Sequence, residues 1–449
     1  MAKINPNLMV DQEWTGTFFM PGQEEAAFAG RLKYSPTDGV RLEYARAAQF
    51  STPAKEADLL HGHTSTGMPL TLIGEFSSRG AGYSFHNGMH YWTSSGHPFR
   101  YAIFGHHFEE SDAFESFEFE LTGAQEFFCP EGQKSQIPHS TTEVVNAKCG
   151  PGEFKVIHSS RFEFVHGDLR TYFHSEDSAA LTELQHAYED IRGRHPNFHP
   201  FLKKELDFIF RFVPSTNLGV REAYSSIHDV ADLFALLAFE PVRLTRLAAM
   251  VRDQEGHQHH MPVFPSSLDD RTTIERSLAK RDYHSLPLNN SAVSLELLIP
   301  KWKDKCKNYS STTSMLQSMT NIVSTHETHG SIVLCATQLE DIAVEAGFTS
   351  RRDKYSYGVS TFASPKLREK LASLLECKED EIGQSYSSLR GEIAHVRKAR
   401  RYLNRLGSKR VYLVSRAMQL VVIGYILEQI GVSEKGREQY QDRLLPTLW

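Results

Sequence analysis

The sequence predicts an α+β fold with a β-rich N-terminal domain, a middle helical segment and a C-terminal domain that is an all-α helical bundle. The first third alternates apolar and polar residues, whereas after residue 177 apolar residues recur with helical spacing. A turn-rich stretch, residues 282–294, separates two helical segments. A chain of 449 residues is long enough for two or three domains. We therefore divide it into residues 1–177, 178–285 and 286–449.

The β-rich domain is predicted from period-two alternation across residues 14–173, as at Val40 and Leu42. The stretch "RLKYSPTDGVRLEY" places turn-forming residues between two alternating runs. Pro36 presets a turn and Gly39 tolerates a positive φ, which is the chemistry of a β-hairpin. We expect the strands to build a sandwich-like or jelly-roll-like domain.

The middle segment, residues 178–285, shows the spacing of helices. The apolar positions that show it are Leu181, Leu184, Tyr188, Ile191, Val230, Leu233, Leu236 and Leu237. This pattern predicts helices that follow the sheet, each with one apolar face turned to the core.

The C-terminal domain, residues 286–449, is predicted to be a compact bundle of about four or five helices joined by short loops. Ser364 is expected to cap one helix, with Pro365 at its first position. Another helix is expected near residues 302–322. The apolar stripes that predict further helices are Ile332/Cys335/Leu339/Ile342/Ala346, Leu367/Leu371/Leu374 and Leu389/Ile393/Val396/Leu403/Leu406.

The most apolar segment, residues 411–432, carries Arg416, Gln419 and Glu428 in its interior, and each of these is costly in lipid. It is therefore predicted to be a core helix rather than a membrane span. The N-terminus lacks an apolar signal-peptide region, and the five cysteines are widely spaced without a C-x-x-C pair. These features favour a cytoplasmic protein with no membrane contact and no disulfide framework.

The formal net charge of −6 means that nucleic-acid binding would depend on a local basic patch. One basic run extends from Ile393 to Arg410 and contains no Asp or Glu. Its cations are Arg397, Lys398, Arg400, Arg401, Arg405, Lys409 and Arg410. We expect Arg397, Lys398, Arg400, Arg401 and Arg405 to hold an RNA backbone by their charge.

Arg390 and His395 stand beside this run and are the candidate catalytic pair. Arginine stays charged and fits phosphate oxygens, whereas histidine exchanges a proton near neutral pH. The pair suits RNA cleavage in which the 2′-hydroxyl attacks the adjacent phosphorus, and that chemistry needs no metal. On one ideal helix the two side chains diverge by about 140°. They would converge if the helix is irregular near Gly391, or if two copies meet across a two-fold axis.

A non-functional explanation stays open for this pair, because an Arg and a His in a basic helix can simply face solvent.

Several of the 22 histidines cluster, at 61 and 63, at 86, 90 and 97, at 106 and 107, and at 257, 259 and 260. No cluster has H-E-x-x-H spacing or paired cysteines, so we expect no metal and no cofactor. The "HETHG" motif, residues 326–330, is expected to cap a helix.

Glu340 and Asp341 lie on the polar face of a predicted helix, where they could orient His395 or pair with the basic run. A solvated acidic face is the competing explanation for both. The sequence has no Walker A loop, no G-x-S-x-G elbow and no Rossmann fingerprint. These absences argue against nucleotide hydrolysis and serine-hydrolase chemistry.

Two stretches resemble known families. The segment "LASLLECKEDEIGQSYSSLRGEIAHVRKARRYLNRLGSKRVYLVSRAMQLVVIGYILEQIGV" resembles the HEPN family of helical-bundle domains, and Arg390 and His395 take the two positions of its Arg/His signature. The N-terminal "EWTGTFFMPGQEEAAFAGRLKYSPTDGVRLEY" and "MPLTLIGEF" resemble the domain that precedes an ApeA-like HEPN domain in bacterial anti-phage abortive-infection proteins. The chain departs from the HEPN pattern at Gly391, where those nucleases often carry Asn, Asp or His.

The resemblance implies a toxin-like endoribonuclease that stops translation when phage infection is sensed. It implies transfer RNA as the substrate, and a homodimer or higher homo-oligomer formed through the HEPN bundle. A phage-encoded protein would be the trigger. The alternative is a catalytically silent HEPN dimer that serves as an RNA- or partner-binding module, with the β-rich domain as sensor of a phage component.

Overall fold

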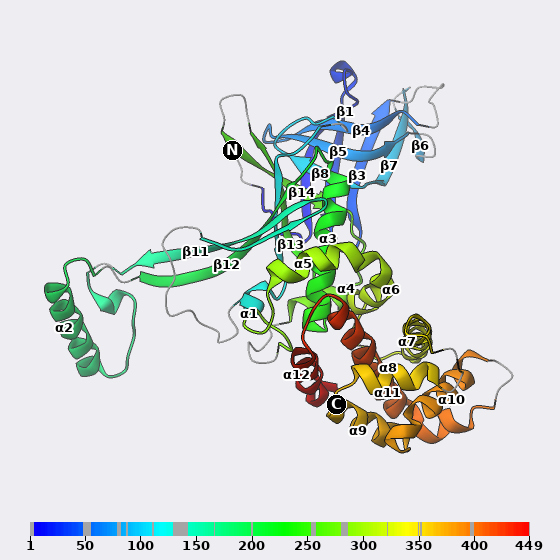
Figure 1. Ribbon diagram of the computed structural model, residues 1–449. Coiled ribbons are helices and arrows are strands. Elements are labelled where there is room, and N and C mark those ends of the chain that lie inside the picture. The colour runs from blue at the N-terminus through cyan, green and yellow to red at the C-terminus, as the bar shows by residue number, and fades with distance from the viewer. Residues whose placement is uncertain are drawn as a thin grey trace.

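The computed structural model describes residues 4–47, 55–78, 82–86, 89–109, 112–128, 142–165, 167–198, 201–252, 257–279, 286–320, 322–348, 350, 353–395 and 399–448. Within these ranges an antiparallel sheet precedes a helical region, so the predicted α+β class is confirmed. Figure 1 shows the sheet in the upper part of the molecule and the helices below it. One hydrophobic core continues from the sheet into the helices.

The described strands all belong to one sheet. They are β1 (Gln12–Phe19), β2 (Phe28–Ser35), β3 (Gly39–Ala47), β4 (Ala57–Thr64), β5 (Pro69–Phe76), β6 (Gly82–His86), β7 (Met89–Phe99), β8 (Tyr101–Phe104), β9 (Ser116–Leu121), β10 (Thr142–Cys149), β11 (Gly152–Phe164), β12 (Phe201–Pro214), β13 (Leu244–Arg252) and β14 (Gln258–Pro265). Their order is β10-β11-β12-β9-β13-β14-β8-β5-β4-β1-β2-β3-β7-β6. The β-rich domain is thus built on a single sheet, whereas a sandwich would have two.

The hairpin expected around Gly39 is present. Strands β2 and β3 pair antiparallel from Ser35↔Gly39 inward, and Gly39 has a φ of +73°. A Cβ at this glycine would lie 2.4 Å from Oγ of Ser266. The same Oγ accepts the Val40 N–H at 2.6 Å, so the turn is fastened to the chain segment that follows β14.

Residues 178–285 contain the expected helices α2 (Ser178–Arg194), α3 (Val220–Ala238) and α4 (Arg271–Leu278), but also strands β12, β13 and β14 of the sheet. The prediction of a helical middle segment is therefore incomplete. Phe208, Phe210 and Phe212 of β12 are buried at alternate positions. This is the same period-two signal that identified the first strands, and the sheet accordingly continues past residue 177.

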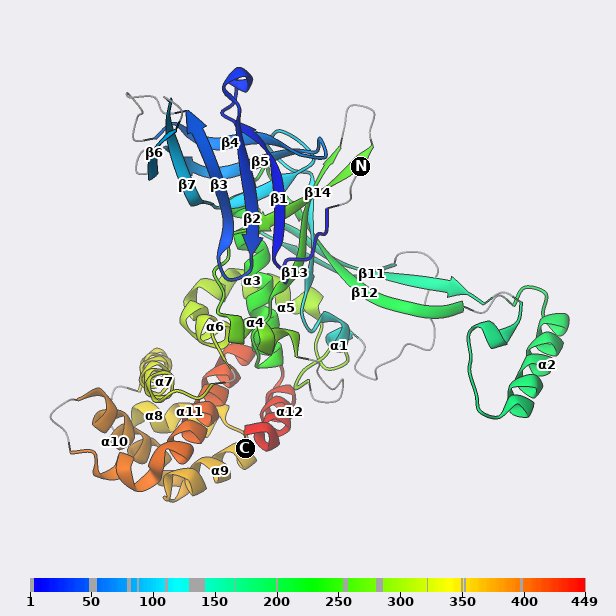
Figure 2. The ribbon, with the colours of Figure 1, turned by 180° about the vertical axis from the view of Figure 1, so that it is seen from behind.

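Strands β11 and β12 extend beyond the rest of the sheet as a two-stranded arm, with α2 near its tip (Figures 1 and 2). A small apolar cluster of Val165, Leu169 and Tyr188, separate from the main core, holds α2. The Tyr188 hydroxyl donates to the Val165 carbonyl oxygen at 3.2 Å. The tip of the arm therefore has a minor core of its own.

The remaining described helices form the lower part of the molecule. They are α1 (Ala124–Phe128), α5 (Leu295–Lys305), α6 (Ser310–Gln317), α7 (Thr325–Glu345), α8 (Asp353–Phe362), α9 (Pro365–Leu375), α10 (Ile382–Ala394), α11 (Arg401–Gln429) and α12 (Glu434–Leu444). Helix α11 packs against α7, α8, α9, α10 and α12, which gives the expected bundle. Ser364 accepts the Leu367 N–H and Pro365 follows it, so the predicted cap of α9 is confirmed.

Helix α11 is long and apolar enough to cross a membrane. However, 89% of its most apolar window is buried inside the fold. The interior residues Arg416 and Gln419 are themselves buried and hydrogen-bonded to each other. These contacts agree with the prediction that this segment is a core helix.

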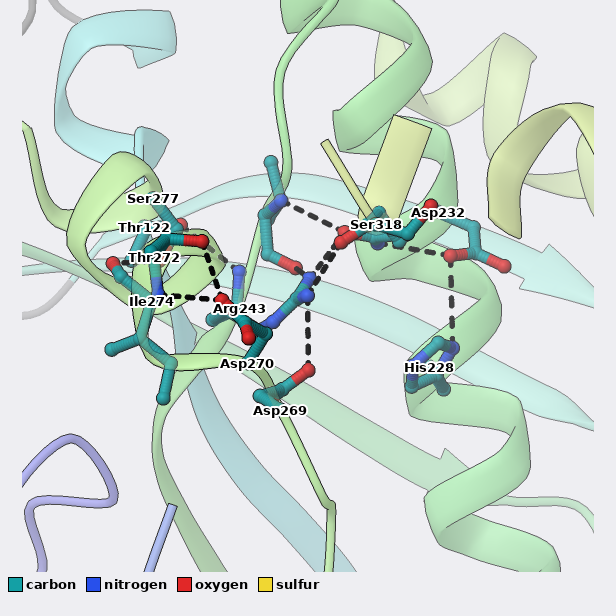
Figure 3. A network of polar contacts seen from close by, with 12 residues as sticks. Thr122, His228, Asp232, Arg243, Asp269, Asp270, Thr272, Ile274, Ser277 and Ser318 are labelled. Atoms are coloured by element: carbon teal, nitrogen blue, oxygen red, sulfur yellow. Dashed lines mark hydrogen bonds and ion pairs between the residues drawn. The ribbon is translucent and has the colours of Figure 1, made fainter. Parts of the chain in front are cut away.

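A buried polar network joins the sheet to the helices (Figure 3). Arg243, directly before β13, donates from Nη1 to Oε1 of Gln317 and from Nη2 to the Gln317 carbonyl oxygen, both at 2.6 Å. The same Oε1 accepts the Val242 N–H at 2.9 Å, and Nε2 of Gln317 donates to Asp232 of α3 at 2.9 Å. Asp269 lies 2.9 Å from Nη2 of Arg243. One glutamine at the end of α6 thus connects β13 with α3.

Replacing this glutamine should weaken the whole fold. In Gln317→Leu the Val242 N–H loses its acceptor and Nη1 of Arg243 loses one, so buried donors are left unpaired. We expect the free energy of unfolding to fall by about 2–4 kcal/mol, measured by urea denaturation. Gln384→Leu, at an exposed position of α10, is the control and should change stability little. Equal losses in the two variants would contradict this role for Gln317.

Candidate functional site

Helix α10 ends at Ala394, so the two candidate catalytic residues do not lie on one helix. Arg390 is in the last turns of α10, whereas His395 is the residue after the helix, with an extended backbone (φ −112°, ψ 111°) and an exposed side chain. The prediction of one helix from Leu389 to Leu406 is therefore wrong. Gly391 lies within α10 and the helix ends at Ala394, so the divergence of about 140° on an ideal helix does not describe this pair.

Arg390 is half-buried against the bundle. Its Nε atom is buried and has no hydrogen-bond partner within the part of the chain that the structure describes. One turn earlier, the buried hydroxyl of Tyr386 donates to the Ile332 carbonyl oxygen of α7 at 2.7 Å. The backbone beneath Arg390 is thus fixed to α7, while the guanidinium keeps donors that are uncommitted.

The basic run divides into three parts. Arg397 and Lys398 lie outside the described residues. Arg400 and Arg401 are exposed at the start of α11, and no carboxylate of the described ranges lies within 4 Å of either. Arg405 is different, because its Nε lies 3.3 Å from a carboxylate oxygen of Glu376.

Glu376 therefore supplies an acid that the local sequence of the run lacks. It follows α9 in a left-handed conformation, with a φ of 52°, and it also pairs with Arg410. The guanidinium of Arg405 lies 4.8 Å from the ring centroid of Tyr402 as well. The charge of Arg405 is thus partly balanced within the fold, whereas Arg400, Arg401 and Lys409 have no carboxylate within 4 Å among the described residues.

Glu392 holds the two ends of the connection between α10 and α11 together. Its side chain is buried, with 8% exposed. Oε1 accepts the Tyr402 N–H at 3.2 Å and Oε2 accepts the Leu403 N–H at 2.8 Å. Since these are amides of the first turn of α11, the carboxylate also meets the positive end of that helix. His395, Arg400 and Arg401 are consequently presented on one short connection beside the last turn of α10.

The sequence analysis did not identify this role of Glu392. The sequence signal that was available is that Glu392 is the last acid before the long basic run. A carboxylate placed some ten residues before a helix start is not part of a local capping pattern. The pairing depends on the chain turning back, which the structure reveals.

The first turns of α7 also face this connection. Ser324, rather than the histidines of "HETHG", caps α7 by accepting the Glu327 N–H at 3.1 Å, so the expected capping role of His326 and His329 is wrong. Burial lowers the pKa of His329 below its usual value, and the charges of Arg400 and His326 lower it further. His329 is therefore a neutral imidazole at neutral pH in the electrostatic field of Arg400.

The acidic residues that could have oriented His395 are engaged elsewhere. Glu340 accepts a hydrogen bond from the Tyr355 hydroxyl and lies 3.7 Å from Nζ of Lys354. Asp341 is exposed on the same helix. Glu340 is thus part of the contact between α7 and α8, which is neither a pairing with the basic run nor a purely solvated acidic face.

The structure gathers some of the clustered histidines in the sheet. The rings of His61 and His107 stack with centroids 4.5 Å apart, and His63 contacts His107 edge-on at 4.7 Å. Nε2 of His61 and Nε2 of His107 lie 3.0 Å from the backbone oxygens of Phe108 and Gly62. No group of three or more His, Cys, Asp or Glu among the described residues is arranged to hold a metal ion.

The arrangement at the α10–α11 connection combines an exposed imidazole with arginines that have no acidic partner among the described residues. A flexible polyanion can approach such an exposed surface, and its phosphates would neutralise the free positive charge. An imidazole next to a bound phosphate can exchange a proton with a neighbouring hydroxyl. The geometry is therefore suited to binding and acid–base chemistry on a phosphodiester.

Comparison with known families gives one result. Residues 13–302, more than half of the chain, match the family model described as ApeA N-terminal domain 1. This match includes the sheet with α2, α3 and α4, and it runs across the boundary that we predicted at residue 177. No curated protein and no solved structure matches the chain.

Removal of the Glu392 carboxylate should loosen the α10–α11 connection. We expect Glu392→Ala to lower the free energy of unfolding by about 1–2 kcal/mol, and Glu392→Gln to cost less because its amide oxygen keeps one acceptor. Hydrogen exchange at the Tyr402 and Leu403 amides should become faster in Glu392→Ala. Glu369→Ala, an exposed position on α9, is the control. Unchanged exchange at both amides would refute the bonding described above.

Proposed function

The chain belongs to the ApeA family, a family of anti-phage defence, and from this premise we propose that it is a metal-independent endoribonuclease of the HEPN type. The observation that carries the proposal is the α10–α11 connection. There, exposed His395 and the unpaired cations Arg400 and Arg401 follow directly after the helix that carries Arg390.

In the proposed reaction His395 accepts the proton of a ribose 2′-hydroxyl. The 2′-oxygen then attacks the adjacent phosphorus, the bond to the 5′-oxygen of the next nucleotide breaks, and the leaving 5′-oxygen takes the proton from the His395 imidazolium. Arg390 offers its fork of N–H donors to the phosphate oxygens as their charge grows. The products are a 2′,3′-cyclic phosphate and a 5′-hydroxyl, so the reaction needs neither water nor a metal in this step.

Transfer RNA is the substrate that we propose, because the ApeA-like resemblance implies an effector that stops translation. The chemistry needs a nucleotide that can align its 2′-oxygen with the scissile bond, and unpaired loops of folded RNA meet that condition. Arg400 and Arg401 would hold the backbone on either side of the cut. A phage-encoded protein, sensed by the β-rich domain, is the proposed trigger.

We further propose that the active unit is a homodimer or higher homo-oligomer. Arg390 is half-buried in the last turns of α10, whereas His395 follows the helix with an extended backbone and an exposed side chain. A two-fold axis beside α10 would bring the connection of a second copy to the same phosphate, so that Arg390 of one chain acts together with His395 of the partner subunit. Isologous contacts of this type are the commonest way to form oligomers.

The catalytic pair can be tested directly. His395→Ala should reduce RNA cleavage by about 10²- to 10⁴-fold with little change in stability, because the side chain is exposed. Arg390→Lys should also lose most activity, since an ammonium does not reproduce the two-pronged contact with phosphate. Cleavage is measured by sequencing RNA ends that carry a 2′,3′-cyclic phosphate after expression of the full chain.

His186→Ala, an exposed histidine on α2, is the matched control and should remain fully active. Full activity of His395→Ala would sink the proposed mechanism. Loss of cleavage in EDTA, with recovery in magnesium, would also sink it. RNA that is bound by the wild-type chain but never cut would favour the alternative, a silent RNA-binding module.

Sharing of residues between chains has its own test. An Arg390→Ala chain and a His395→Ala chain should each be inactive, whereas their mixture should recover cleavage if one site uses Arg390 from one copy and His395 from the other. With random pairing and one intact shared site in each mixed dimer, about a quarter of wild-type activity is expected. A fully active monomer at the assay concentration, shown by analytical ultracentrifugation, would exclude the composite site.

A further inference from the structure

A cavity of about 510 Å³ lies where the helices beneath the sheet meet the C-terminal bundle. Its walls come from α6, the start of α7 and the middle of α11, with Arg276 of α4 on one side. Its volume is within the range of sites for small organic molecules. The lining residues that matter here are Arg276, Met315, Met319, Ser331, Arg416 and Gln419.

Arg416 is the most unusual side chain of this cavity. It is only 7% exposed, although it is a cation. Its guanidinium lies 4.0 Å from the centroid of the Phe239 ring, and Nη1 donates to Oε1 of Gln419 at 2.7 Å. Nε2 of Gln419 in turn donates to Oγ of Ser331 on α7 at 2.6 Å. The guanidinium is therefore held in place by α7, by α11 and by the residue that follows α3.

The charge of Arg416 has no acidic partner of its own. The carboxylate in its vicinity is Glu240, and both Glu240 oxygens already bind Arg276, at 2.5 and 2.8 Å. No described carboxylate lies within 4 Å of Arg416, and no described group accepts from its Nε or Nη2. Burial lowers the pKa of Arg416 to about 10, as expected for a cation without a counter-ion.

We propose that this cavity binds a small organic anion, whose phosphate or carboxylate group pairs with Arg416. Such a pair would use the two free donors of the guanidinium as a fork. Met315, Met319 and Leu334 provide an adaptable apolar wall for the body of the molecule. The serines of α6 that face the cavity, among them Ser311 and Ser314, offer hydroxyls to its polar edges.

The rim of the cavity is exposed to solvent, so a ligand can enter there. Ile322 and Val323 line it and are 63% and 61% exposed, which is unusual for side chains of this type. Glu327, the acidic residue on the lining, is exposed in the first turn of α7, next to His326. The negative end of the ligand is thus directed inward to Arg416 and away from Glu327.

One turn of α7 links this cavity to the helix that carries Arg390. Ser331 faces the cavity, and the next residue, Ile332, accepts the hydrogen bond from Tyr386 below Arg390. One turn of α7 therefore touches both places. Binding in the cavity does not depend on the proposed function, because the ligand is recognised by Arg416 whether or not the α10–α11 connection cleaves RNA.

Gly330 gives a way to fill the cavity without disturbing the fold. It lines the cavity within α7, and a Cβ there would meet no atom within 4 Å. Gly330→Leu should therefore fold normally while occupying space that the ligand needs. Gly193→Leu is the matched control, since Gly193 also lies in a helix, on the distant α2, with open space around a Cβ. Arg416→Gln removes the charge itself.

The experiment measures thermal unfolding of the full chain with adenosine 5′-monophosphate, citrate or uncharged adenosine. At least one of the two anions should raise the midpoint by about 2 °C or more in the wild type and in Gly193→Leu. Adenosine should have no such effect, and Gly330→Leu and Arg416→Gln should not respond to either anion. The proposal is overturned if neither anion stabilises the wild type, if adenosine matches the nucleotide, or if Gly330→Leu responds like the wild type.

Discussion

A largely enclosed arginine directly before β13 determines how the sheet and the helices can meet. Removing the Arg243 guanidinium from water is costly, and the cost is offset only if its donors find acceptors of fixed position. Asp269 supplies the charge and Gln317 supplies two oxygens. Because Gln317 also binds the backbone of Val242 and a carboxylate of α3, α6 has one position that satisfies every partner.

The position of α6 also affects the elements that follow it in the chain. α6 provides one wall of the cavity that contains Arg416, and the segment after it leads directly into α7. α7 then carries both the hydrogen bond to Gln419 and the hydrogen bond from Tyr386. The polar contacts that organise the bundle are thus anchored, one after another, to the start of β13, an interior strand of the sheet.

The sequence predicted the class of the fold and several of its details for sound physical reasons. The turn at Gly39, the cap at Ser364 and the burial of α11 follow from local chemistry: a positive φ, a hydroxyl next to free amides, and a long apolar run. The strands β12 to β14 were overlooked because α2, α3 and α4 lie before, among and after them in the chain. A helix signal in one part of a segment does not exclude strands in the rest.

The candidate site was harder to predict than the fold. Residue types alone singled out Arg390 and His395, but their spacing was interpreted on a helix that ends before His395. Likewise, the basic run contains no acid in its sequence, but the fold brings Glu376 beside it, where Glu376 pairs with Arg405 and Arg410. Glu392 binds amides some ten residues later in the chain, and His329 lies in the electrostatic field of Arg400, which is far away in sequence. Such relations arise from tertiary folding, and no local pattern encodes them.

The central place of α11 has a consequence for biosynthesis. α7, α8, α9 and α10 all pack against this helix, yet each of them precedes it in the chain. While a ribosome is still making α11, the earlier helices contact one another but lack the helix against which all of them pack, so the bundle cannot be completed. The sheet can fold well before this moment. An incomplete chain would therefore carry a finished sheet, while the connection that presents His395 stays unformed until α11 has emerged.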